Sequence, residues 1–279
     1  MDDPLLWAGE RDLMTMRVSI DFRDEARDLY AFLETLEVED WTTPTLFKGW
    51  TPWDVVAHLH YFDEVSLHAA DGEEAFTARR KEFLTSTGGG MTIKEVHCRG
   101  LGHCDAPELL ERWKATADAL SSKLGSLDPK ARLPWFGPDM GAKMFTTARY
   151  MEAWSHAQAI YDLKRVTREH RDRIRNIVTI GLRTFGWTFV NRGQEIPGPP
   201  PYLRLTSPSG ELWEYNAPSD VERIEGNALD FCLTVTQVRN VEDTALSVRG
   251  DLSKRWMEIA QCFAGPPNDP PEPGVRIGA

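Results

Sequence analysis

Four segments of this chain carry apolar side chains at three- and four-residue intervals, which is the spacing of one face of an α-helix. These segments cover residues 12–36, 52–70, 105–125 and 148–163. The apolar face of the first consists of Val18, Phe22, Ala26, Leu29, Leu33 and Leu36. Amphipathic helices joined by connections of moderate length bury their apolar faces against one another, so the pattern predicts an N-terminal four-helix bundle.

Capping signals mark the limits of two of these helices. Thr51 is suited to cap the second helix, with Pro52 at its first position and Asp54 in the place of a capping-box acid. The third helix is expected to begin after Asp105 and to end at Gly125, since glycine favours the backbone conformation that follows a helix.

Two other segments have some helical character. Residues 85–104 are rich in glycine, which predicts an irregular connection with a short helix near residues 91–96. Residues 171–192 carry apolar side chains at helical spacing and end at Gly193, so we expect a further helix there.

Beyond Gly193 the pattern changes to short strands. Residues 196–201 are mostly proline and read as a rigid linker, and residues 202–215 predict two strands joined by a tight turn at 207–210. The remaining expected elements are a strand at 221–225, a helix at 228–238, a strand at 246–249 and a helix capped by Asp251. This order of elements predicts a small α+β domain.

The expected fold class is therefore α+β overall. Residues 1–169 would form the four-helix bundle, residues 170–267 the small α+β domain, and residues 268–279 a disordered tail.

Charge and composition limit the kinds of molecule that this protein is expected to bind. The formal charge of −11 arises from 32 basic and 43 acidic residues without long runs of one sign, which argues against nucleic acid or an anionic membrane. No apolar stretch approaches the roughly 20 residues that span a bilayer. The N-terminal residues lack the features of a signal peptide, so we expect a cytoplasmic protein. A small-molecule substrate fits best, with the chain as a monomer or homodimer.

The cysteines do not suggest a disulfide framework. Four cysteines in 279 residues are too few and too scattered for one. Cys232 and Cys262 lie in apolar helical patterns, so we predict that both are buried thiols.

Three side chains on two of the predicted helices form a candidate metal site. Glu152 and His156 are four residues apart, so they project from one helix face about 5 to 6 Å apart at Cβ. His58 lies within an apolar helix, where an unpaired imidazole is costly to bury. Two imidazoles and a carboxylate are typical of catalytic zinc sites with an open position. The alternatives are a core histidine bound to an ordinary acceptor and an exposed helical pair.

The sequence around these residues resembles a known family. Residues 41–45, 49–59 and 151–156 contain Trp-Thr-Thr-Pro-Thr, Gly-Trp-Thr-Pro-Trp-Asp-Val-Val-Ala-His-Leu and Met-Glu-Ala-Trp-Ser-His. They resemble the metal-binding domain of mycothiol-dependent maleylpyruvate isomerases, which belong to the DinB-like four-helix-bundle superfamily. The resemblance covers roughly residues 10–165, and the rest of the chain is similar to the family's sterol-carrier-like second domain.

The resemblance places the family's metal ligands on His58, Glu152 and His156 and implies a divalent metal, most often zinc. It also implies an isomerase or transferase that uses a low-molecular-weight thiol such as mycothiol. In the isomerases the thiol adds to a cis double bond, rotation follows, and elimination gives the trans product. A metal can ionise the thiol or polarise a carbonyl.

Two other functions fit the same residues. One is a metal-dependent hydrolase or cyclase that needs no thiol. The other is a non-catalytic protein that binds a small ligand and holds a structural metal. A fourth protein ligand that closed the metal site would exclude catalysis.

An anionic substrate would also require an arginine from the second domain, because a guanidinium holds a carboxylate through two hydrogen bonds. Arg239 is the candidate by its approximate place in the motif, and Arg249 and Arg255 are alternatives. The competing interpretation is that these arginines form ordinary salt bridges.

The sequence contains further histidines, cysteines and aromatic side chains that could contribute to a site. His97-Cys98 and His103-Cys104 match no common zinc-knuckle spacing, but this loop is expected near the open end of the bundle, where His97 or Cys98 could line a substrate. His60 points away from His58 on a helix. An aromatic surplus, which serves mainly packing and could partly wall a pocket, consists of Trp50, Trp53, Trp135, Phe136 and Trp154.

Overall fold

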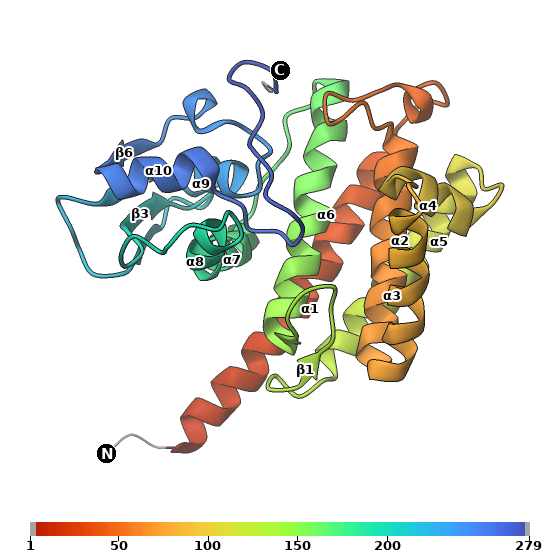
Figure 1. The fold of residues 1–279 in the computed structure, drawn as a ribbon, viewed down its shortest axis with the longest axis horizontal. Helices are drawn as coiled ribbons and strands as arrows, with labels where there is room; N and C mark the ends of the chain where they lie inside the picture. The colour runs from red at the N-terminus through yellow and green to blue at the C-terminus, as the bar shows by residue number, and fades with distance from the viewer. Residues whose placement is uncertain (1–3, 277–279) are drawn as a thin grey trace. The chain divides into compact units, whose positions relative to one another are not determined.

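A computed structural model describes residues 4–276, and its contacts divide the chain into two compact units, 1–157 and 158–279. The three residues at each end, which belong to the expected N-terminal start and C-terminal tail, lie outside the described residues. The first unit is helical and the second combines helices with a sheet (Figure 1). The predicted α+β class is therefore confirmed.

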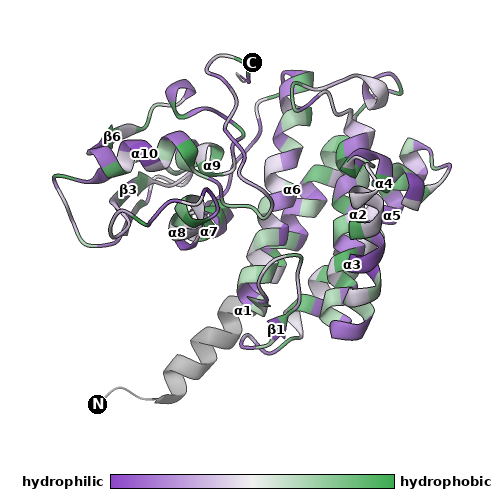
Figure 2. Ribbon diagram, viewed as in Figure 1, coloured by the Kyte–Doolittle hydropathy of each residue, from purple (hydrophilic) through white to green (hydrophobic). Residues whose placement is uncertain are grey.

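The four long helices of the first unit correspond to the four amphipathic segments and form the predicted bundle (Figure 1). They are α1 (Pro4–Leu33), α2 (Pro52–Asp71), α5 (Ala106–Gly125) and α6 (Ala142–Lys164), of which α6 continues into the second unit. The expected apolar face of α1 is buried from Val18 to Leu33. Hydrophobic and hydrophilic residues alternate along the coloured parts of α2 and α6 (Figure 2).

The start of α2 follows the capping prediction in full. Thr51 accepts a hydrogen bond from the Asp54 backbone N–H, and the Asp54 carboxylate accepts from the Thr51 backbone in return. Lys94 contacts the same buried carboxylate at 2.7 Å. These bonds fix the helix start six residues before His58.

The region between α2 and α5 contains more helix than the sequence predicts. It forms α3 (Glu73–Gly88), where no helix was expected, and α4 (Ile93–Leu101), which corresponds to the short helix expected near residues 91–96. The pattern in α3 is weak because Phe76 is its one buried residue. α4 begins with a capping box of Thr92 and Glu95, whose spacing is visible in the sequence.

A short hairpin precedes α6. Its strands are β1 (Arg132–Leu133) and β2 (Met140–Gly141), which pair antiparallel. A single 3-10 turn, η1 (Asp40–Thr42), joins the end of α1 to the segment before α2 and buries Trp41.

The second unit contains a four-stranded sheet in the order β4-β3-β5-β6. Its strands are β3 (Tyr202–Thr206), β4 (Leu212–Tyr215), β5 (Arg223–Asn227) and β6 (Ser247–Arg249). The predicted hairpin of β3 and β4 is confirmed, and β5 runs parallel to β3 with Leu203 opposite Ile224. Both of these side chains are fully buried, so they anchor the core of this unit.

The helices of the second unit are α7 (Arg175–Arg183), α8 (Phe185–Val190), α9 (Ala228–Val235) and α10 (Asp251–Ile259), with 3-10 turns η2 (Asp172–Ile174) and η3 (Val241–Asp243). The continuous helix expected over 171–192 is interrupted at Thr184. The Thr184 hydroxyl donates to the carbonyl oxygens of Ile180 and Gly181, a local bond that bends helices.

The segment after α10 is held by hydrogen bonds, although its composition suggested disorder from residue 268. Asn268 donates to the Gln237 side chain, and the backbone N–H of Gly274 donates to Asp243. Arg276 donates to the Gln237 carbonyl oxygen at 3.1 Å. Polar groups of Gln237, which follows α9, and of Asp243 in η3 therefore supply partners that composition does not reveal.

Candidate metal centre

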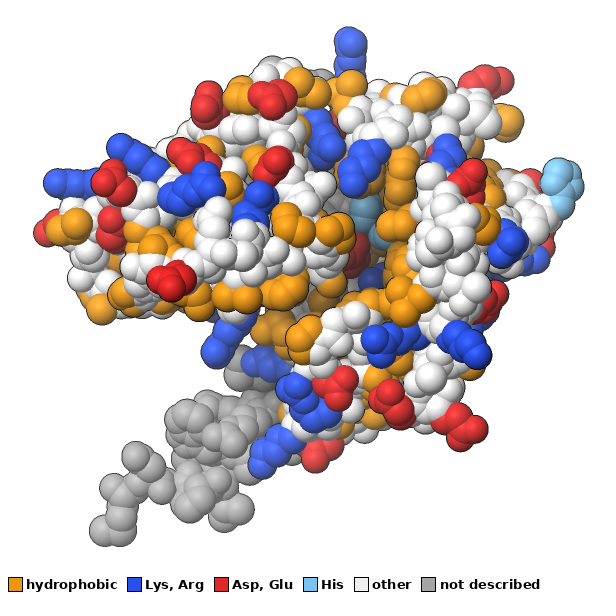
Figure 3. All heavy atoms as spheres, in the orientation of Figure 1, with side chains coloured by type: hydrophobic (Ala, Val, Ile, Leu, Met, Phe, Trp, Pro, Cys, Tyr) orange, Lys and Arg blue, Asp and Glu red, His pale blue; other side chains and the backbone are white. Residues whose placement is uncertain are grey.

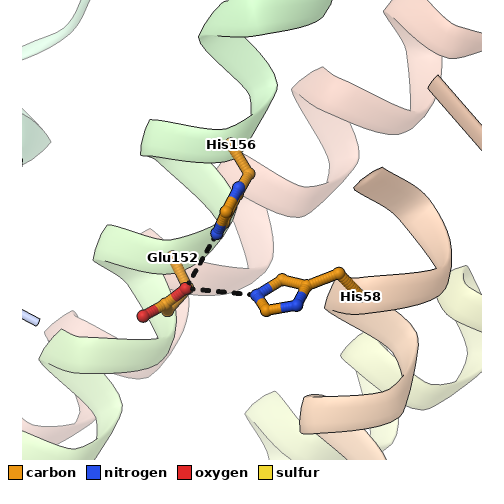
Figure 4. A group of neighbouring side chains, drawn as sticks. All are labelled: His58, Glu152 and His156. Carbon is orange, nitrogen blue, oxygen red and sulfur yellow. Dashed lines mark ion pairs between the residues drawn. The ribbon is translucent and has the colours of Figure 1, made fainter. Parts of the chain in front are cut away.

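The structure brings His58, Glu152 and His156 together within the first unit. His58 projects from the middle of α2, and the other two project from successive turns of α6 (Figure 4). The Nε2 atom of His156 lies 3.1 Å from Glu152 Oε2, and His58 Nε2 lies 3.5 Å from the same oxygen. One potential donor atom from each residue lies within 4.8 Å of the other two.

This spacing suits a metal ion. Ligand atoms about 2.1 Å from a tetrahedral zinc ion lie about 3.4 Å from one another, close to both measured separations. The distance of 3.5 Å between His58 Nε2 and Glu152 is long for a hydrogen bond. The donor set and its geometry therefore fit a divalent ion of the zinc type.

The environment favours the protonation states that bind metals. Burial and the nearby charge of His156 lower the pKa of His58 to about 4. Burial alone would raise the pKa of Glu152, but its close contacts with the imidazoles of His156 and His58 hold it well below its usual range. A neutral imidazole and an ionised carboxylate are the forms that coordinate metals.

Aromatic rings enclose the two imidazoles. Trp50 stacks on His156 with ring centroids 5.9 Å apart, and its edge contacts His58 at 5.2 Å. Phe47 contacts His156 at 5.1 Å and Phe62 contacts His58 at 4.9 Å. Of the predicted aromatic residues, Trp50 thus lines the site directly.

The other predicted aromatics serve packing. Trp135 and Phe136 contact Phe62, one layer away from His58. Trp154 is buried in the core, and Trp53 donates from Nε1 to the Cys104 carbonyl oxygen.

A buried ion pair links the two helices that carry the site residues, and sequence reasoning missed it. Asp63 of α2 accepts hydrogen bonds from Arg149 of α6 at 2.9 and 3.0 Å and from Trp113 at 3.1 Å. Both charged side chains are at most 4% exposed. An aspartate within the apolar run of α2 was the available signal, since a buried carboxylate requires partners.

The histidines and cysteines of the glycine-rich segment differ in their exposure to solvent. His97 is buried and its ring lies 5.1 Å from that of His58, whereas Cys98 and His103 are exposed. Burial and the charges of His58 and His156 lower the pKa of His97 to about 2. Within the described part of the chain, no grouping of possible metal donors includes these residues.

His60 is also buried, with Nε2 3.8 Å from Glu64. It contributes no atom to the group formed by His58, Glu152 and His156. The predictions that Cys232 and Cys262 are buried are confirmed.

The candidate arginines lie in the second unit. Arg239 follows α9, is buried, and donates from Nη2 to Asp162 at 2.7 Å. Arg249 is exposed, and Arg255 forms an exposed pair with Glu258. Arg239 is therefore buried, whereas Arg249 and Arg255 are exposed. The sequence did not predict the contact of Arg239 with Asp162.

Comparison with known proteins bears on this site. A family model described as the mycothiol maleylpyruvate isomerase N-terminal domain matches residues 22–161. The chain belongs to this family. The matched range includes all three residues of the candidate metal centre.

Relatives extend the similarity over most of the chain. An uncharacterized protein of Mycobacterium tuberculosis, present in two strains, is 34% identical over 248 residues, which cover 88% of this chain and 95% of that protein. Two crystal structures are also similar, one of mycothiol-dependent maleylpyruvate isomerase with a TM-score of 0.46 and one of its histidine-to-alanine mutant with 0.48. Each is 13% identical and covers 81% of this chain and 87% of its own.

The surface charges and the lengths of the helices give no further information on the candidate metal centre. Acidic and basic side chains are interspersed on the face that Figure 3 displays. In residues 4–276, we find no helix with both the length and the apolar character needed to cross a bilayer.

Proposed function

We propose that this protein is a metal-dependent enzyme that acts on a small organic molecule and holds one divalent ion, preferably zinc, with His58, Glu152 and His156. The observation that carries this proposal is a group of three donors to which the described residues add no fourth His, Cys, Asp or Glu. A zinc ion with three protein ligands retains a position for a further ligand.

The proposed reaction is a thiol-assisted isomerisation or transfer, with mycothiol as the thiol. When bound, a divalent metal would lower the pKa of a thiol and polarise a carbonyl group. His58 and His156 provide nitrogen donors, and Glu152 provides the negative charge. Trp50, Phe47 and Phe62 surround the imidazoles and limit the access of water. Membership of the isomerase family supports a thiol in preference to water as the nucleophile.

Arg239 is proposed to bind the carboxylate of an anionic substrate. Its guanidinium is planar and already oriented by Asp162 at 2.7 Å. An Arg239→Lys variant keeps the charge but loses the two-pronged geometry. We expect this variant to raise the KM for an anionic substrate much more than it lowers metal content.

Metal analysis tests the proposal directly. Purified wild-type protein should contain about one equivalent of metal, measured by elemental mass spectrometry. His58→Ala and His156→Ala should each reduce metal affinity by at least about tenfold, since one of three ligands is lost. His60→Ala is the matched control on α2 and should retain the metal. Metal affinity in both site variants equal to that of wild type, measured by competition with a chelator, would exclude this ligand set.

Thiol dependence separates the proposed reaction from its alternatives. Turnover of maleylpyruvate by the zinc-loaded protein should require mycothiol. Hydrolysis or cyclisation of another substrate without a thiol would instead identify a metal-dependent hydrolase or cyclase. A stoichiometric metal that binds no exogenous ligand would indicate a structural ion in a binding protein.

A further inference from the structure

His97 is a buried polar residue beside the candidate metal centre that has no assigned role. It belongs to α4, outside the four long helices, and the residue is 1% exposed. Its Nε2 atom is buried and has no hydrogen-bond partner among the described residues. Leaving such an atom unsatisfied costs about 1 to 3 kcal/mol, so a ligand that bonded to it would be stabilised.

The surroundings of His97 place it next to the metal ligands. Its ring centroid lies 5.1 Å from that of His58 at an interplanar angle of 62°. Trp50, whose ring contacts both His58 and His156, also contacts His97 edge-on at 6.4 Å. Three imidazoles therefore surround one indole ring.

Specific contacts hold α4 in this position. Lys94 pairs with the buried Asp54 at the start of α2, and Trp53 donates to the Cys104 carbonyl oxygen just beyond α4. The Thr92 and Glu95 capping box fixes the register of α4, which directs His97 inward and leaves Cys98 exposed. Contacts on both sides of His97 therefore fix its position, as supporting residues do in functional sites.

His97 is nevertheless separate from the ligand set. The described donors that group within 4.8 Å of one another are those of His58, Glu152 and His156. An imidazole that adjoins a metal site without joining the ligands is suited to contact whatever molecule enters the site.

We propose that His97 is a ligand-binding residue of this centre, whose Nε2 forms a hydrogen bond with the thiol or water molecule that completes the metal's coordination. The inference rests on the proposed metal-dependent function. It assigns α4 a share in selecting the exogenous ligand, in addition to its packing against α2.

Cobalt substitution tests the role of His97 without an activity assay. Wild type, His97→Phe and His97→Gln are loaded with Co²⁺, and 2-mercaptoethanol is titrated against the sulfur-to-cobalt charge-transfer band. Phenylalanine keeps an aromatic ring among Trp50, Tyr61 and Phe62 but removes the nitrogen. We expect about one equivalent of cobalt in each protein and a roughly five- to tenfold weaker thiol Kd in His97→Phe, the effect of one hydrogen bond.

The controls separate this inference from the proposed function. His60→Phe alters another buried histidine with an unpartnered Nδ1 and should leave the thiol Kd unchanged. His97→Gln, which retains a polar side chain, should recover part of the affinity. Loss of cobalt from the His97 variants would make His97 a metal ligand and overturn the inference, as would an unchanged thiol Kd. Absence of stoichiometric cobalt from wild type would overturn the proposed function itself.

Discussion

At the scale of single residues, the pair formed by Asp63 and Arg149 determines how rigidly the site is held. Burial raises the pKa of Asp63 even though Arg149 and Trp113 donate hydrogen bonds to its carboxylate. A buried pair is not a large net source of stability, but removing one partner leaves an uncompensated charge. The pair also ties α2, which carries His58, to α6, which carries Glu152.

Replacing Arg149 should therefore be severely destabilising. We expect Arg149→Met to lower the free energy of unfolding by about 3 to 5 kcal/mol, measured by urea denaturation. Metal affinity should also fall, because the spacing of α2 and α6 relaxes. The double variant Asp63→Leu with Arg149→Met should lose less than Arg149→Met alone. Arg112→Met, which removes an exposed pair with Glu108, serves as the control and should cost under about 1 kcal/mol.

Residue types predicted the metal-site candidates but not their surroundings. The spacing of Glu152 and His156 places them on one helix face, and the apolar helix around His58 together with the family resemblance indicated the third member. The choice between His97 and Cys98 depended on the register of α4, which composition left open. The contact of Arg239 with Asp162 joins residues 77 positions apart, a separation that no local pattern encodes.

At the scale of elements, the start of α10 depends on a carboxylate from another segment. We expected Asp251 to cap this helix, but the N-cap position is Gly250 and it supplies no side chain. Glu222, which precedes β5, accepts hydrogen bonds from the backbone N–H groups of Leu252 and Ser253 and from the Ser253 hydroxyl. Burial would raise the pKa of Glu222, but these bonds outweigh it and lower the pKa.

Glu222→Gln should destabilise the protein by about 1 kcal/mol at neutral pH, the usual effect of losing a helix cap. Because the folded-state pKa of Glu222 is depressed, its contribution is present above the unfolded value of about 4.3 and is lost as the pH falls through the folded value. Urea denaturation at several pH values should show the two proteins converging below that range. Glu258→Gln on the same helix is the control at neutral pH and should change the stability by under about 0.5 kcal/mol, because Glu258 is exposed.

Helices were predictable where one face is buried along their length. α2, α5 and α6 meet this condition, and so does α1 over residues 18–33. α3 does not, because a single buried phenylalanine gives no periodic signal over its 16 residues. The break between α7 and α8 was also hidden, since Thr184 interrupts the backbone while the apolar spacing continues.

At the scale of the whole molecule, the three metal-site residues and the buried pair belong to one compact unit. The contacts divide the chain between residues 157 and 158, within α6, whereas the sequence placed the domain limit after residue 169. His58, His97, Glu152 and His156 all precede the division. Metal binding should therefore stabilise the first unit directly.

Zinc titration checks this expectation. A ligand that binds only the folded state stabilises it by about 2.7 kcal/mol at a free concentration 100 times its Kd. For a unit of this size, that corresponds to a rise in Tm of roughly 5 to 10 °C. Differential scanning calorimetry should show this rise in wild type and in His60→Ala but not in His58→Ala. Hydrogen exchange should slow in α2 and in residues 142–157 of α6, since these segments carry the ligands. Equal slowing throughout residues 158–276, or an equal rise in Tm in His58→Ala, would show that zinc acts elsewhere than at this centre.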